Sequence, residues 1–139
     1  MGEKNRKEGA DFLAKNKTKE GVIELESGLQ YKILEEGVGI MPQATDTVTV
    51  HYVGTLIDGT QFDSSIERGE PSTFALDGVI PGWTEGFQLF KEGTKAILYI
   101  PEELAYGAQH RSAEITPYST LIFEVELIKV VKAELQPEP

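Results

Sequence analysis

The sequence predicts an α+β domain in which a curved antiparallel β-sheet wraps around one short central helix. Several short segments alternate apolar and polar residues or are apolar without a break, as strands are, and one segment near residue 81 begins like a helix. With 139 residues, 40% of them hydrophobic, the chain has the length and the apolar content for one domain around a single core.

The N-terminal residues 3–16 predict a helix with a weak apolar stripe. Few of its side chains could pack on a core, and Gly9 lowers its helix propensity by about 1 kcal/mol relative to alanine. Such a helix is seldom stable alone. It is either the stub of a longer helix or a frayed terminus, and the sequence leaves both interpretations open.

Charge also distinguishes this end of the chain. Residues 1–20 hold six basic and four acidic residues, whereas residues 21–139 hold seven basic and nineteen acidic residues. The first twenty residues are therefore expected to be a different kind of element from the rest. No apolar segment typical of a secretory signal follows Met1, and we expect the chain to be part of a longer protein.

The strongest strand signal is at residues 45–57, where apolar residues alternate with threonines and His51. Asp58-Gly59 then supplies the turn chemistry of a tight hairpin, after which residues 61–63 are extended again. A shorter strand is expected earlier, at residues 29–34. These segments predict neighbouring antiparallel strands.

The second half of the chain carries the predicted helix and two further strands. Residues 64–72 are expected to be a polar loop, and residues 73–76 could add a short strand. Pro81 suits the first turn of a helix that would continue to Phe90. The remaining elements are a buried strand at 95–100, a long connection at 101–118, a strand at 121–128 with outward glutamates, and a solvated tail.

Composition excludes several classes of function. A net charge of −10 argues against nucleic-acid binding, which needs clustered lysine and arginine. No segment approaches the ~20 apolar residues of a membrane span. The chain has no cysteine and its two histidines lack ligand partners, so we expect neither a metal nor a cofactor.

Aromatic residues at turns and element ends are the most informative feature. They are usually core residues, but they could also line an apolar pocket with a few polar groups, as small-ligand sites do. The residues in question are Tyr52, Phe62, Phe74, Trp83, Tyr106 and Phe123.

Three blocks carry a resemblance to a known family. VHYVGTLIDGTQFDSS at 50–65, VIPGWTEGFQLFKEGTKAILYIPEELAYG at 79–107 and TPYSTLIFEVELIKV at 116–130 resemble FKBP-type peptidyl-prolyl cis-trans isomerases. The preceding linker resembles that of the bacterial Mip-like and FkpA-like branch. The resemblance implies an FKBP-like fold with an N-terminal helical and linker segment at 1–26, a catalytic domain at 27–132 and a disordered tail at 133–139.

The resemblance also implies a set of site residues. By position, the catalytic residues are Tyr52, Asp63, Ile80, Trp83 and Tyr106, and the pocket residues are Phe62, Arg68, Phe74, Val79, Ile115 and Phe123. In the family, the indole forms the floor under the proline ring, and the N–H of Ile80 and the hydroxyl of Tyr106 would bind ligand carbonyls. Asp63 either orients the twisting amide or ties Tyr52 and Arg68 into the scaffold.

The sequence departs from the family at the pocket rim. Ser72 stands where many relatives have phenylalanine, Arg111 where histidine is common, and Glu114 where an apolar or small residue is common. These departures bear on substrate preference and inhibitor affinity more than on the basic reaction. They also motivate a rival interpretation, a module that binds proline segments with little turnover; a spacer role in a dimer is a second rival.

The function implied by the resemblance is isomerisation of X-Pro peptide bonds in protein substrates, with no covalent intermediate and with inhibition by rapamycin-type macrolides. The expected partners are proline-containing polypeptides. This domain is expected to be monomeric, and the parent protein a homodimer through an absent N-terminal module. The family also implies the periplasm or cell envelope of a Gram-negative bacterium.

Overall fold

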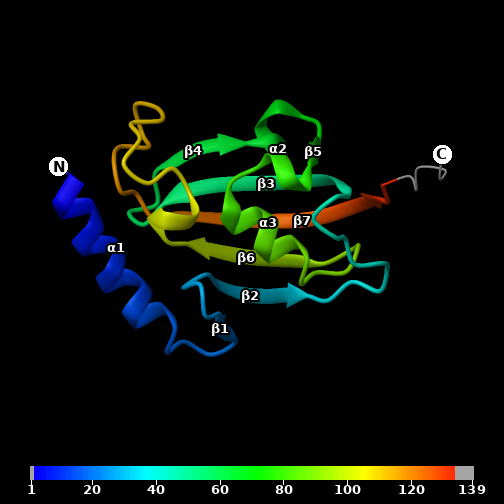
Figure 1. Ribbon diagram of the computed structural model, residues 1–139, viewed down its shortest axis with the longest axis horizontal. Coiled ribbons are helices and arrows are strands. Elements are labelled where there is room, and N and C mark those ends of the chain that lie inside the picture. The colour runs from blue at the N-terminus through cyan, green and yellow to red at the C-terminus, as the bar shows by residue number, and fades with distance from the viewer. Residues whose placement is uncertain (1, 134–139) are drawn as a thin grey trace, which may run out of the picture.

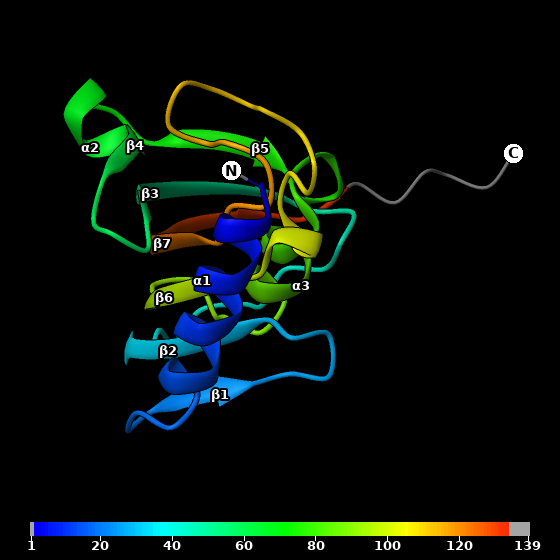
Figure 2. The ribbon, with the colours of Figure 1, turned by 90° about the vertical axis from the view of Figure 1, so that its left-hand side faces the viewer.

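The computed structural model describes residues 2–133, and in them one antiparallel sheet packs a short helix, α3 (Pro81–Phe87), against one face (Figures 1 and 2). This confirms the predicted α+β fold. In spatial order the strands are β1 (Val22–Glu24), β2 (Gln30–Glu35), β6 (Lys95–Ile100), β7 (Leu121–Val131), β3 (Thr47–Leu56) and β4 (Gln61–Ser64), with β5 (Ser72–Ala75) also paired to β3.

β3 and β7 form the centre of the sheet. They pair from Thr47 opposite Val131 to Leu56 opposite Leu121, with a bulge between Thr49 and Val50. Their inward side chains alternate with exposed or half-buried ones, as the sequence predicts for strands that are buried on one face. β7 continues three residues past its expected end because its ladder with β3 resumes beyond the bulge.

α3 approaches β6 closely because two glycines face the strand. A Cβ at Gly82 would lie 2.6 Å from Cγ2 of Ile100, and one at Gly86 would lie 2.6 Å from Cδ2 of Leu98. The helix ends at Phe87 and not at the expected Phe90. Beyond it the backbone closes tighter turns, with hydrogen bonds such as that from the N–H of Phe90 to the carbonyl of Phe87 (3.2 Å).

The expected loop at 64–72 contains a one-turn helix, α2 (Ser65–Arg68). The Ser64 hydroxyl caps it by accepting from the N–H of Glu67 at 3.1 Å, and Gly69 ends it in the left-handed region with φ of 83°. A single turn is too short to show a helical period in the sequence. α2 lies between β4 and β5, which pair with different halves of β3.

The N-terminal helix, α1 (Gly2–Asn16), lies across the strand ends (Figure 1). The amide of Asn5 donates to Oγ1 of Thr116 (2.7 Å) and to the carbonyl of Pro117 (2.8 Å). At the other end of α1, the amide of the buried Asn16 donates to Oε1 of Gln30 (2.8 Å).

β1 lies inside the segment expected to be linker, where it pairs with β2 as an edge strand. Of the expected tail, residues 134–139 lie outside the described residues. No helix in the part of the chain that the structure describes is long and apolar enough to cross a membrane.

Candidate active site

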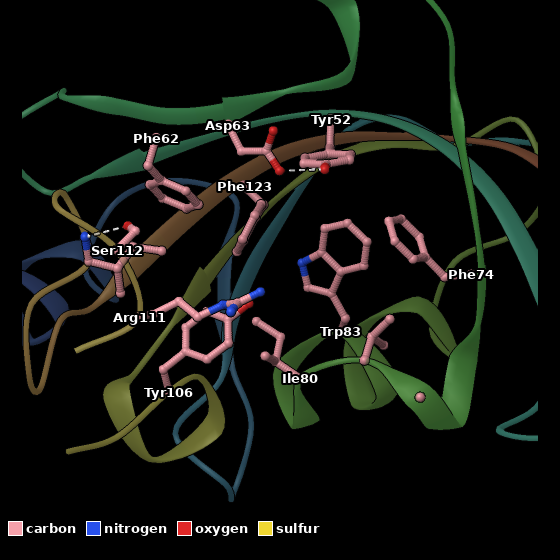
Figure 3. Close-up of a pocket in the computed structure, with 13 residues that line it drawn as sticks. Tyr52, Phe62, Asp63, Phe74, Ile80, Trp83, Tyr106, Arg111, Ser112 and Phe123 are labelled. Carbon is pink, nitrogen blue, oxygen red and sulfur yellow. Dashed lines mark hydrogen bonds between the residues drawn. The ribbon is translucent and has the colours of Figure 1, made fainter. Parts of the chain in front are cut away.

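A pocket of about 790 Å3 opens between α3, the strands β3, β4 and β7, and the loop that precedes β7 (Figure 3). Ten of the eleven residues implied by the resemblance line it, and the eleventh, Arg68, bonds to two of them. The lining residues are Tyr52, Phe62, Asp63, Phe74, Gly78, Val79, Ile80, Trp83, Tyr106, Arg111, Ser112, Ile115 and Phe123.

Trp83 forms the floor of this pocket and is 4% exposed. Its indole packs edge to face with four rings, among them Tyr52 at 5.2 Å and Phe123 at 5.1 Å between centroids. Its Nε1 is a buried donor without a hydrogen-bond acceptor in the described part of the chain. Because rings enclose it, the indole is held rigidly by packing rather than by a polar contact.

Three polar side chains form a closed network on one wall. The Tyr52 hydroxyl donates to Oδ2 of Asp63 at 2.6 Å, and Arg68 pairs with Oδ1 of the same carboxylate. Arg68 Nη2 also donates to the Tyr52 hydroxyl at 3.0 Å and to the Ser72 hydroxyl at 3.1 Å. The turn of α2 is what returns Arg68 to Asp63, because it folds the intervening residues into one helical turn.

This network sets the protonation states on the wall. Burial opposes ionisation of Asp63, but the hydrogen bonds from Tyr52 and Arg68 and the charge of Arg68 outweigh it, so the pKa of Asp63 is below its usual value. Burial, together with the neighbouring Asp63 carboxylate, raises the pKa of the Tyr52 hydroxyl. At neutral pH the wall therefore holds an ionised carboxylate, a neutral phenol and a guanidinium.

Ser65, a buried serine behind the wall, is a residue of the site region that the sequence did not indicate. The hydroxyl of Ser65 accepts from the backbone N–H of Tyr52 at 2.7 Å and lies 2.9 Å from Nδ1 of His51. It thereby fastens α2 to the middle of β3. His51 fills the mixed face of its strand in this way, and His110 is exposed on a loop.

The opposite rim is the flap, residues 105–118, which brings Tyr106, Arg111, Ser112 and Ile115 to the pocket. Arg111 and Ser112 were not among the predicted site residues, although Arg111 stood out as a departure from the family. At the floor's edge, Ile80 precedes α3, and its carbonyl accepts from the N–H of Trp83 (2.9 Å) and of Thr84 (3.2 Å). Within residues 2–133 its own N–H has no protein acceptor.

Most of the side chains that line this site are apolar or aromatic, as in a binding pocket. Residues 2–133 hold no group of three or more histidine, cysteine, aspartate or glutamate side chains that could ligate a metal. What the geometry offers is an apolar cavity with a rigid ring floor, an ionised polar wall and hydrogen-bond donors at its rim.

This combination of sheet, central helix and ring-lined pocket defines the class of FKBP-like isomerase domains, and the comparisons with known proteins identify the family. The sequence model of the family of FKBP-type peptidyl-prolyl cis-trans isomerases matches residues 38–128. A second family model, for the domain amino-terminal to these isomerases, matches residues 1–33. The chain belongs to the FKBP-type peptidyl-prolyl cis-trans isomerase family.

Relatives in Gram-negative bacteria are similar over most of the chain. It is 53% identical to the FKBP-type peptidyl-prolyl cis-trans isomerase FkpA of Aeromonas hydrophila over 128 residues, which are 92% of this chain and 47% of that protein. It is 50% identical to the outer membrane protein MIP of Legionella longbeachae, covering 94% of this chain and 56% of that protein.

Among solved structures, the crystal structure of FkpA from Escherichia coli superposes with a TM-score of 0.89 at 48% identity, covering 94% of this chain and 61% of that one. The chain thus spans about half the length of the curated relatives it matches. The Mip-like and FkpA-like resemblance inferred from the linker and the three blocks is confirmed.

Proposed function

We propose that this chain accelerates cis-trans rotation about X-Pro bonds in polypeptide substrates. Membership of the family supports the reaction, and the observation that carries it here is the apolar pocket floored by Trp83, wide enough for a prolyl ring and its flanking residues. Nothing in this reaction forms or breaks a covalent bond, so it needs no nucleophile, metal or cofactor.

The pocket acts by favouring the twisted amide over the planar one. Resonance holds the X-Pro bond planar against a barrier of about 18–20 kcal/mol, and twisting removes that resonance and lowers the amide dipole. An apolar, water-excluding cavity therefore stabilises the twisted state relative to water. Trp83 grips the pyrrolidine ring while the preceding carbonyl turns.

Two donors would fix the substrate in the productive orientation. The N–H of Ile80 is free of protein acceptors in the described residues, and the Tyr106 side chain also lines the pocket (Figure 3). Donors placed where a carbonyl ends its rotation stabilise the transition state selectively. Their contribution is smaller than in an oxyanion hole, because little charge develops on a twisting amide.

In the proposed mechanism, Asp63 is part of the scaffold. Both of its oxygens are already engaged, Oδ2 by the Tyr52 hydroxyl and Oδ1 by Arg68 and the N–H of Ser64 (2.9 Å). A carboxylate with its acceptor sites occupied holds Tyr52 and Arg68 in place and presents a fixed negative field to the pocket. Comparison of Asp63→Asn with Arg68→Met separates this role from direct orientation of the amide.

The wider setting of the activity is proposed by family analogy. Residues 27–132 would form the catalytic domain and residues 1–26 the end of a segment that leads, in a longer parent protein, to a dimerisation module; the domain alone would be monomeric. Proline-containing polypeptides are the proposed partners and rapamycin-type macrolides the proposed inhibitors. The Gram-negative relatives, one of them named an outer membrane protein, favour the cell envelope.

The test is isomerisation of a short X-Pro peptide, followed with and without rapamycin, by the protein and by its Trp83→Leu variant. We expect acceleration that rapamycin abolishes and that falls at least about tenfold in the variant, since the ring floor is lost while an apolar side chain still fills part of its volume. Circular dichroism checks that the variant is folded.

The outcomes distinguish the candidate functions. A folded protein that does not accelerate exchange but binds proline peptides would support the binding-module alternative, which the atypical flap motivates. Acceleration that is unaffected by Trp83→Leu would place the activity outside this pocket.

A further inference from the structure

Arg111 is a charged group of the pocket that the proposed reaction does not use. Its guanidinium lies over the ring of Tyr106, 5.4 Å from the ring centroid, on the flap side of the pocket (Figure 3). The turn that carries it is closed by hydrogen bonds from the N–H of Arg111 to the carbonyl of Ile115 (2.9 Å) and from the N–H of Ile115 to Oγ of Ser112 (3.1 Å). Because Ile115 is only 5% exposed, the turn is anchored in the pocket wall.

The charge of Arg111 is not compensated within the site. Asp63 is the other charged side chain that lines the pocket, and it is already paired with Arg68. In the described part of the chain no carboxylate lies within ion-pair distance of Arg111, and the nearby Glu114 accepts instead from the Ser112 hydroxyl (3.4 Å). The rim therefore presents a positive charge on a protein whose net charge is −10.

We propose that Arg111 makes this site selective for prolines that have an acidic residue directly before or after them. The inference rests on the proposed isomerase function and names its substrate class. A guanidinium that stacks on an aromatic ring is partly pre-ordered and offers several N–H donors to a carboxylate. A proline held on Trp83 brings its neighbouring side chains to the rim, where Arg111 lies.

Specificity set by Arg111 is distinguishable from the effect of net charge, because the two predict opposite orders of kcat/KM for acidic and basic peptides. Long-range repulsion by a protein of charge −10 disfavours acidic peptides and favours lysine peptides. That repulsion is screened beyond about 10 Å at 0.1 M salt, whereas a carboxylate in contact with Arg111 is screened less. At moderate salt the contact should decide the order.

The experiment measures kcat/KM for two series of otherwise identical peptides, one with glutamate, glutamine or lysine before the proline and one with the same residues after it. At about 0.15 M salt we expect glutamate to exceed glutamine by about two- to fivefold in at least one series, the range of an exposed ion pair, and lysine to rank last there. Arg111→Gln should remove this preference and Arg111→Glu should invert it.

Lys129→Glu is the matched control, because it changes the net charge as Arg111→Glu does, from an exposed position on β7 that does not line the pocket. It should retain the preference for glutamate. Equal kcat/KM for glutamate and glutamine in both series, or a preference that survives Arg111→Gln, would overturn the inference while leaving the isomerase intact. Absence of activity on every peptide would overturn the proposed function as well.

Discussion

Tyr52 contributes to the site through both its ring and its hydroxyl. The ring packs on Trp83 and Phe123, while the hydroxyl donates to Asp63 and accepts from Arg68. One side chain thus joins the apolar floor to the polar wall. The position of the indole and the protonation state of the wall therefore depend on the same residue.

The role of Asp63 can be tested against that of Arg68. If the carboxylate acts as scaffold, Asp63→Asn and Arg68→Met should lower kcat/KM by similar factors of about tenfold or less, because each breaks the same network. Peptide isomerisation measures the rates, and the double variant should cost little more than either single one.

A different pattern would indicate direct action on the amide. In that case Asp63→Asn would lower kcat/KM much more than Arg68→Met does. An Asp63→Asn variant with unchanged kcat/KM and unchanged stability would remove this residue from the mechanism altogether.

At the scale of elements, α1 is fastened to both ends of the segment that carries the flap. Asn5 bonds to Thr116 and Pro117 after the flap tip, and the guanidinium of Arg6 lies 4.0 Å from the centroid of the Tyr118 ring. The same arginine lies 3.9 Å from the carboxylate of Glu102, before the flap. A helix whose own apolar stripe is weak is therefore held by contacts at its N-terminal end, in addition to the bond from Asn16 to Gln30 at its C-terminal end.

Gly9 makes this docking testable. In an undocked helix, Gly9→Ala would stabilise α1 by about 1 kcal/mol through helix propensity. In the docked helix a Cβ would lie 2.2 Å from Oγ1 of the buried Thr120, so we expect the substitution to destabilise the protein instead, by about 1–3 kcal/mol. Chemical unfolding measures the sign.

The matched control is Gly9→Ala in a chain that also carries Thr120→Ala, where the opposing hydroxyl is absent. Measured against Thr120→Ala alone, Gly9→Ala should then destabilise the protein less than it does in the otherwise unchanged chain. A stabilising Gly9→Ala in the otherwise unchanged chain would show that α1 does not pack on the domain in solution.

At the scale of the whole molecule, Asp46 joins distant parts of the chain. It is buried just before β3, where its carboxylate accepts from the N–H of Gln43 (2.7 Å), from Nζ of Lys132 (2.9 Å) and from the N–H of Ala133 (2.8 Å). Burial raises its pKa, but these hydrogen bonds and the charge of Lys132 outweigh that effect and lower the pKa to about 2. The end of β7 is thereby tied to the start of β3.

Because this pKa is lowered, we expect part of the free energy of unfolding to be lost in acid. Between pH 4 and 2 the native carboxylate binds fewer protons than the unfolded one, whose pKa is near the usual 3.8, so its stabilising effect is present above that window and lost as the pH falls through it. The linked free energy is about 2 kcal/mol.

Urea unfolding between pH 7 and 2 measures this contribution. Asp46→Asn should lower the stability at pH 7 and flatten the acid limb, whereas Asp77→Asn, the same change at an exposed position, should leave the curve nearly unchanged. Parallel curves for Asp46→Asn and the unsubstituted protein would contradict the prediction.

The sequence by itself determined the central strands and most of the residues that line the pocket. Alternation at β3 and β7 and the apolar run of β6 predict these elements, because burial of one face leaves a period of two that can be read locally. The residues that line the pocket were indicated by resemblance to a family with matching blocks. No periodicity assigns a role to Ile80 or Tyr106.

Only the tertiary structure decided how these pieces meet. The turn α2, the edge strand β1 and the docking of α1 left no local signal. A single turn, a three-residue strand and a helix held by contacts at both ends depend on partners elsewhere in the chain. The same holds for Arg111. That an exposed arginine on a loop lies over Tyr106, while the Asp63 carboxylate is paired with Arg68, follows from long-range packing, which no spacing in the sequence records.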